Sequence, residues 1–113
     1  DNNEGIDVSS FLATITAAAN TWDKETNAQL VGSINQKSGI RSPVQNNENS
    51  ISFGDYPQAG VIAVTYAWVD RATSKIIEFD IMFDTDFNWG DASLNPALMD
   101  LQNIATHELG HGF

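Results

Sequence analysis

Two histidines and a glutamate near the carboxyl end of the sequence have the spacing of a metal-dependent hydrolase site. His107, Glu108 and His111 form the pattern His-Glu-x-x-His, and the chain has only these two histidines. Residues four apart on an α-helix lie on one face, so both imidazoles can bind a single metal ion. Zinc suits these donors, and a catalytic zinc keeps one position open for water. Glu108 would take a proton from that water as general base and pass it to the leaving amine.

The pattern leaves two questions open. Its alternative interpretation is a pair of exposed histidines on the last turn of a helix, where the helix dipole favours them. A zinc site also needs a third protein ligand, and the sequence contains neither a cysteine nor another histidine. That ligand would be an Asp or Glu brought in by the fold, or a residue beyond Phe113 if the chain is a fragment. For residues 1–113 alone we therefore expect weak, incomplete or absent zinc binding.

The ending of the chain resembles the metzincin metallopeptidases, and among them the matrixin branch. The metzincin pattern is HExxHxxGxxH, and residues 107–111 match its first five positions. The family's Gly and third His would follow three and six residues after His111, and its first strand is not evident ahead of the first predicted helix. The resemblance to matrixin-like domains continues upstream. Residues 76–89 are similar to their last strand, and residues 100–113 to their active-site helix. Residues 49–55 and 60–68 are similar to the two preceding strands, and residues 11–22 to the first helix.

This resemblance implies a secreted, zinc-dependent endopeptidase that acts on a peptide or protein substrate. His107 and His111 would be the zinc ligands and Glu108 the catalytic base. The resemblance also implies that the segment 61–69 is the sheet edge beside the substrate cleft. A substrate would add a strand to that edge by β-augmentation, although an edge strand exposed only to solvent is the alternative.

Two predicted helices would position the motif. Apolar residues at helical spacing predict a helix from Ser9 to about Thr26, with a side that faces the core. A second predicted helix, from Asn95 or Pro96 to about Gly110, would carry the motif. We place its start at Asn95 or Pro96 because proline is favoured in a first helical turn. Gly110 would leave room for a neighbouring backbone near the metal. The apolar residues that define the two stripes are Phe11, Ile15, Ala18 and Trp22 in the first helix and Leu98, Leu101, Ile104 and Ala105 in the second.

The remaining elements are predicted to be strands. Residues 29–35 and 50–53 form short candidates, and a loop rich in Asn, Ser, Gly and Pro covers 36–49. The segments 61–69 and 75–83 have strand composition and a short connection, which predicts an antiparallel hairpin. We expect one α+β domain over residues 1–113. Its twisted, mostly antiparallel or mixed sheet would carry both long helices on one face, as in the upper subdomain of a zincin.

Charge and hydropathy exclude several functions. The formal net charge is −10, with 15 acidic and 5 basic residues, which argues against nucleic-acid binding. No apolar run approaches the roughly 20 residues that span a membrane. Four aspartates precede the final helix, and a solvated acidic turn is favoured over a calcium site there. These aspartates are Asp80, Asp84, Asp86 and Asp91.

Two other functions fit the sequence. One is a metal hydrolase of a different class, with a distant Glu as its third ligand. The other is a non-enzymatic, acidic α+β module for binding or structure, which keeps the motif without a metal. The oligomeric state is not indicated by any feature of the sequence.

Overall fold

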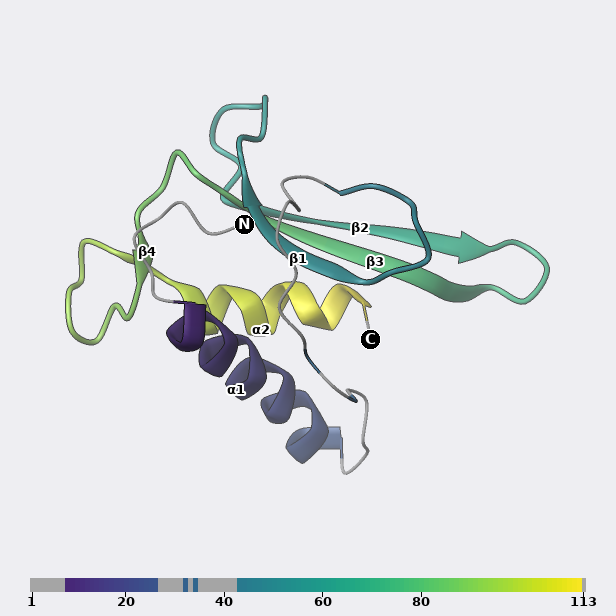
Figure 1. The fold of residues 1–113 in the computed structure, drawn as a ribbon, viewed down its shortest axis with the longest axis horizontal. Coiled ribbons are helices and arrows are strands. Elements are labelled where there is room, and N and C mark those ends of the chain that lie inside the picture. The colour runs from purple at the N-terminus through teal and green to yellow at the C-terminus, as the bar shows by residue number, and fades with distance from the viewer. Residues whose placement is uncertain (1–7, 27–31, 33, 35–42, 113) are drawn as a thin grey trace.

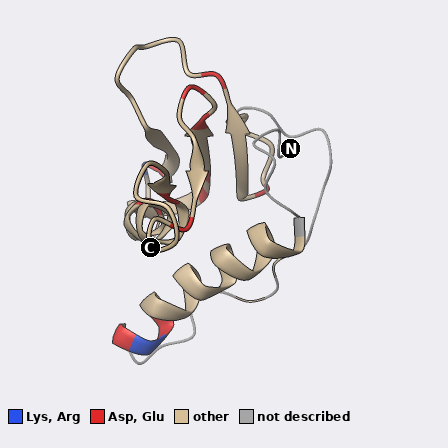
Figure 2. Cartoon of the chain, turned by 90° about the vertical axis from the view of Figure 1, so that its left-hand side faces the viewer, with Lys and Arg blue, Asp and Glu red and all other residues tan. Residues whose placement is uncertain are grey.

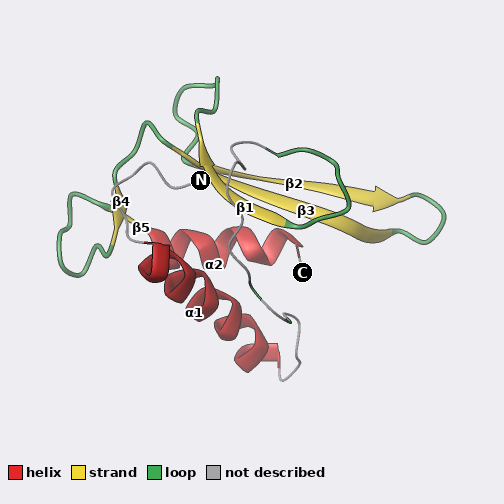
Figure 3. Ribbon diagram, in the orientation of Figure 1, coloured by secondary structure: helices red, strands yellow, loops and turns green. Residues whose placement is uncertain are grey.

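The computed structural model describes residues 8–26, 32, 34 and 43–112 as an α+β fold with a mixed sheet and two helices (Figure 1). The predicted fold class is therefore confirmed. Both helices lie on the same side of the sheet, and the coloured elements of Figure 3 show the two layers. In chain order the elements are α1 (Val8–Thr26), β1 (Ser50–Gly54), β2 (Ala63–Asp70), β3 (Lys75–Asp84), β4 (Trp89–Gly90), β5 (Met99–Asp100) and α2 (Leu101–Gly112).

The main sheet has the strand order β1-β3-β2, which leaves β2 at an edge of the sheet that the structure describes. β1 runs parallel to β3, with Ser50 opposite Asp80. β2 runs antiparallel to β3, with Thr65 opposite Ile81, and a register shift lies between Trp68 and Val69. The predicted hairpin and the strand at 50–53 are confirmed. The remaining short strands, β4 and β5, pair with each other in parallel.

The core lies between the helices and the helix-facing side of the sheet, and aromatic rings fill its centre. The ring of Phe53 lies 5.5 Å from that of Phe83 and 6.2 Å from that of Trp89, centroid to centroid. From α1, Ile15 and Ala18 are buried against this cluster. The predicted apolar face of the first helix is therefore a core face, as its spacing indicated.

The start of the second helix differs from the prediction. Helix α2 begins at Leu101, whereas Asn95 begins a turn in which its side-chain oxygen accepts a hydrogen bond from the Ala97 amide at 3.1 Å. The true N-cap is Asp100, whose carboxylate accepts the Asn103 amide at 3.0 Å. Asn and Asp both favour turns and caps, so the Asn-Pro pair marked a turn rather than the helix start. Leu98 consequently precedes the helix, which continues to Gly112.

The predicted solvated acidic turn is wrong for its first two aspartates. Asp80 and Asp84 are each only 1% exposed. On the side of the sheet away from the helices, Asp80 accepts hydrogen bonds from the amides of Val44 and Ser50, both at 3.0 Å. Glu78 accepts hydrogen bonds from the amides of Asn46 and Asn47, which lie with Val44 in the irregular segment that leads to β1. A buried carboxylate needs such donors, and this loop supplies them.

Two predictions concern segments of which the structure describes only a part. The strand predicted at 29–35 lies outside the described residues, apart from Gly32 and Ile34, which are not assigned to a strand. The loop predicted at 36–49 is described from residue 43, and that part contains neither helix nor strand. Within the described residues, no helix has the length and apolar character that a membrane crossing requires.

Candidate metal centre

The two histidines of α2 lie side by side, one helical turn apart. The Nε2 atoms of His107 and His111 are 3.3 Å apart, and their rings are nearly perpendicular at 82°. Two nitrogens that each lie about 2.0–2.1 Å from a tetrahedral zinc ion are themselves about 3.3–3.4 Å apart. Both imidazoles are exposed, so a metal ion can reach them. The donor set and its spacing therefore fit a zinc ion bound by both rings.

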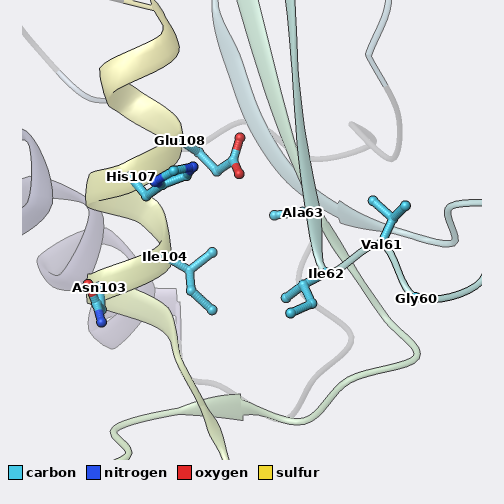
Figure 4. Close-up of a pocket in the computed structure, with 8 residues that line it drawn as sticks. All are labelled: Gly60, Val61, Ile62, Ala63, Asn103, Ile104, His107 and Glu108. Carbon is cyan, nitrogen blue, oxygen red and sulfur yellow. The ribbon is translucent and has the colours of Figure 1, made fainter.

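Glu108 occupies a different environment from its histidine neighbours. It is 8% exposed and its carboxylate points from α2 towards the sheet (Figure 4). The hydroxyl of Thr65, on β2, donates to Glu108 Oε2 at 2.5 Å and lies 3.3 Å from the Glu108 backbone oxygen. The carboxylate is thus close to both imidazoles and held on the side of the edge strand.

A pocket of about 470 Å³ separates α2 from the segment that leads into β2. Ile62 on one wall faces Ile104 on the other, and Glu108 and His107 lie at one end (Figure 4). The Asn103 side chain points away from this space in the same view. The remaining lining residues are Gly60, Val61 and Ala63. The pocket therefore has aliphatic side chains on both walls, together with the polar Asn103 and the ionisable His107 and Glu108.

The candidate ligands form one of two clusters that could hold a metal ion within the described residues. Ligand atoms of His107, Glu108 and His111 all lie within 4.8 Å of one another. In the described part of the chain, no other His, Asp or Glu joins this group. A third ligand from an Asp or Glu brought in by the described fold, which the sequence left open, is therefore not found there.

The second cluster contains Asp84 and Asp86, for which the sequence favoured a solvated turn over a calcium site, together with Asp55, which no pattern in the sequence indicated. Asp55 follows β1, and the parallel pairing of Gly54 with Asp84 brings it alongside. Only knowledge of that pairing would have revealed it. Asp91 does not belong to this cluster, and Asp84 already accepts a hydrogen bond from the Asp86 amide at 2.9 Å.

Helix α2 is held in place by contacts at its glycines and at one carbonyl. The indole nitrogen of Trp22 donates to the Thr106 carbonyl at 2.6 Å. A Cβ atom at Gly110 would lie 2.6 Å from the Trp22 ring. The space at Gly110 is thus filled by an indole from α1 and not, as predicted, by a backbone segment near the metal.

Acidic groups dominate the surroundings of the sheet. Figure 2 shows Asp and Glu positions along the strands and the loops that connect them. Fifteen acidic residues stand against five basic ones, so the chain has few positive side chains to balance its negative charge. Such an excess of negative charge favours the approach of cations.

Comparison of the chain with protein-family models, with curated proteins and with solved structures gives no match. The metzincin resemblance therefore stays a prediction that depends on the motif and on its position after the last strand.

Proposed function

We propose that this chain carries the zinc-binding part of a metalloendopeptidase, with His107 and His111 as zinc ligands and Glu108 as general base. The observation that supports it best is the 3.3 Å separation of the two Nε2 atoms, which matches two ligands of one tetrahedral ion. Zinc, when bound, supplies Lewis-acid activation of a water molecule and of the scissile carbonyl. Matrixin-like descent and an extracellular location form part of the proposal on the strength of the sequence resemblance.

Glu108 is suited to move the proton. Its carboxylate lies among the ligand atoms of the histidines yet is largely removed from bulk water. A general base must lie within hydrogen-bonding reach of the proton it takes, directly or through one water. Glu108 would accept a proton from the attacking water and donate it to the amine of the leaving peptide. The fully exposed alternative, two histidines without a partner group, does not explain a buried carboxylate between them.

The edge strand and the pocket supply a way to align a peptide. β2 is at a sheet edge in the described structure, and its approach segment forms one wall of the pocket. An extended peptide that paired with this edge would pass in front of His107 and Glu108. One of its apolar side chains would enter the space between Ile62 and Ile104. This arrangement supports an endopeptidase that acts on an extended substrate.

Two imidazoles hold zinc incompletely, since catalytic zinc sites use three protein ligands. By the metzincin resemblance the third ligand follows Phe113. We therefore propose that zinc binds weakly to residues 1–113 alone and firmly to a protein in which these residues are followed by that ligand. A zinc measurement on both polypeptides tests this directly, and tight stoichiometric zinc on residues 1–113 would contradict it.

The decisive experiment replaces Glu108 with Gln in the full-length protein that contains these residues. Peptide hydrolysis should fall by about 10²–10⁴-fold, because the proton acceptor is lost, while zinc content measured by atomic absorption stays unchanged. Glu25→Gln, at an exposed position of α1, is the matched control and should change neither the rate of peptide hydrolysis nor the zinc content. Retained hydrolysis in Glu108→Gln would rule out the assigned role. A purified protein that binds no zinc would favour the binding-module alternative.

A further inference from the structure

The contact between Thr65 and Glu108 joins the edge strand to the candidate general base. Thr65 lies in β2, opposite Ile81 of β3. Its hydroxyl donates to Glu108 Oε2 at 2.5 Å and lies 3.3 Å from the backbone oxygen of the same residue. One hydroxyl thus contacts both the side chain and the main chain of Glu108. The two residues are 43 positions apart in the sequence, so only the packing of α2 on the hairpin creates this contact.

A carboxylate at this position needs a donor to define its direction. Glu108 is 8% exposed, and the Thr65 hydroxyl is the side-chain donor to its carboxylate recorded in the described part of the chain. A glutamate side chain loses on the order of 1.5–2 kcal/mol of rotamer freedom when it is held in a single conformation. Hydrogen bonds from a hydroxyl to a carboxylate are short and roughly twice as strong as neutral ones. Thr65 supplies such a bond from a rigid, β-branched side chain on a paired strand.

We propose that Thr65 is a positioning residue for the general base. By holding Oε2, it turns the carboxylate so that Oε1 can accept the proton of the attacking water beside the two histidines. In this role the side chain of Thr65 contacts neither zinc nor substrate and acts through Glu108. The inference rests on the proposed function of Glu108.

The placement of Thr65 on β2 has a second consequence. The strand that would pair with an extended peptide is the strand that orients the base. Substrate alignment and base orientation are therefore set by one rigid element and not by two independent loops. A shift of β2 relative to α2 would disturb both, and misplacement of a reacting group by about 1 Å can cost about 10²-fold in rate.

Hydroxyl removal at residue 65 tests the inference in the full-length protein. Thr65→Val keeps the shape and loses the donor, Thr65→Ser keeps the donor, and Thr65→Ala serves if the valine variant does not fold. We expect the kcat of peptide hydrolysis to fall about 10- to 100-fold in Thr65→Val and Thr65→Ala, as for other residues that orient a functional group. KM should change by less than about twofold, because substrate binding is untouched. Thr65→Ser should restore kcat.

A matched control and a measurement without turnover accompany these variants. Thr21→Val removes an exposed hydroxyl from α1, where it bonds its own helix, and should leave kcat unchanged. In crystal structures of the metal-free proteins, Glu108 should turn away from residue 65 in Thr65→Val. In Thr65→Ser it should keep an O···O distance of about 2.5–3.0 Å. Zinc affinity should be equal in all variants.

Three results would overturn the inference. They are unchanged kcat in Thr65→Val, an unmoved Glu108 carboxylate in its structure, or a loss of kcat that serine does not restore. The Glu108→Gln variant separates this failure from that of the proposed function. If Glu108→Gln is inactive and Thr65→Val is fully active, only the positioning role is wrong. If Glu108→Gln is fully active, the proposed function is wrong, and the crystal structures still decide whether Thr65 orients the carboxylate.

Discussion

The indole nitrogen of Trp22 donates a hydrogen bond of 2.6 Å to the backbone carbonyl of Thr106, the residue directly before the first histidine of the motif. The two residues are 84 positions apart. One turn further along α2, Gly110 lies against the same indole ring. The first helix thus sets the position of the helix that carries both candidate metal ligands.

Gly110→Ala should destabilise the fold, because the cost of overpacking, usually about 1–3 kcal/mol, exceeds the roughly 0.5–1 kcal/mol that alanine gains over glycine within a helix. The added Cβ would lie 2.6 Å from Trp22 Cζ2, so the indole or the helix must move. Urea unfolding followed by tryptophan fluorescence measures the change. Gly32→Ala is the control, because a Cβ there meets no atom within 4 Å. Equal stability of the two variants would show that the indole does not constrain α2.

His107→Ala and His111→Ala should each weaken zinc binding by at least roughly 100-fold, beyond the about 10- to 100-fold loss typical of residues that only support a ligand. Each variant leaves a single imidazole on the helix. Competition with a chromophoric chelator, on the full-length protein, measures the affinity. Gln102→Ala, at an exposed position earlier in α2, should bind zinc normally. If one histidine variant keeps wild-type affinity, the two rings do not share an ion.

Asp80→Asn should destabilise the fold by about 1–3 kcal/mol, the cost of leaving a buried donor without a partner. Its two carboxylate oxygens each accept one amide, from Val44 and from Ser50. An amide side chain has a single oxygen, so its NH₂ group would face one of these N–H groups. Chemical denaturation measures the loss, with the exposed Glu25→Gln as control. A change within about 0.5 kcal/mol, typical of surface positions, would contradict this role for Asp80.

Calcium should raise Tm if the cluster of Asp55, Asp84 and Asp86 binds it. A ligand present at 100 times its Kd stabilises a fold by about 2.7 kcal/mol. Asp55→Asn and Asp86→Asn should abolish the rise, because each removes a ligand atom from the cluster. Asp91→Asn should preserve the rise, since Asp91 lies outside the cluster and bonds Ser93 instead. If Tm is the same with calcium and with a chelator, the cluster does not bind calcium. The exposed Asp86 then belongs to a solvated turn, as the sequence predicted.

Local patterns in the sequence were sufficient for the elements whose structure depends on near neighbours. The spacing of Ile15 and Ala18 in α1 predicted a buried helical face, because the helix period alone brings such residues to one side. Composition and a short connection likewise predicted the β2–β3 hairpin. The pairing of His107 and His111 also follows from helical geometry, and the structure has their rings adjacent.

Errors arose where two local interpretations competed. Asn95 and Asp100 are both good capping residues. In the structure Met99 and Asp100 pair with β4, so the helix begins after Asp100, which caps it. The burial of Asp80 was not predicted, because aspartate side chains are normally exposed to solvent. Nothing near it in the sequence shows that the amides of Val44 and Ser50, 30 or more residues earlier, would donate to its carboxylate.

The sequence by itself determined the helical face that carries two imidazoles one turn apart, since that relationship spans only four residues. Only the tertiary structure decided that Thr65 would reach Glu108, that Asp55 would join Asp84, and that Trp22 would contact α2. These contacts depend on strand order and on the docking of α1 and α2. Such relationships join residues far apart in the chain, and no local periodicity specifies which distant segments will pack together.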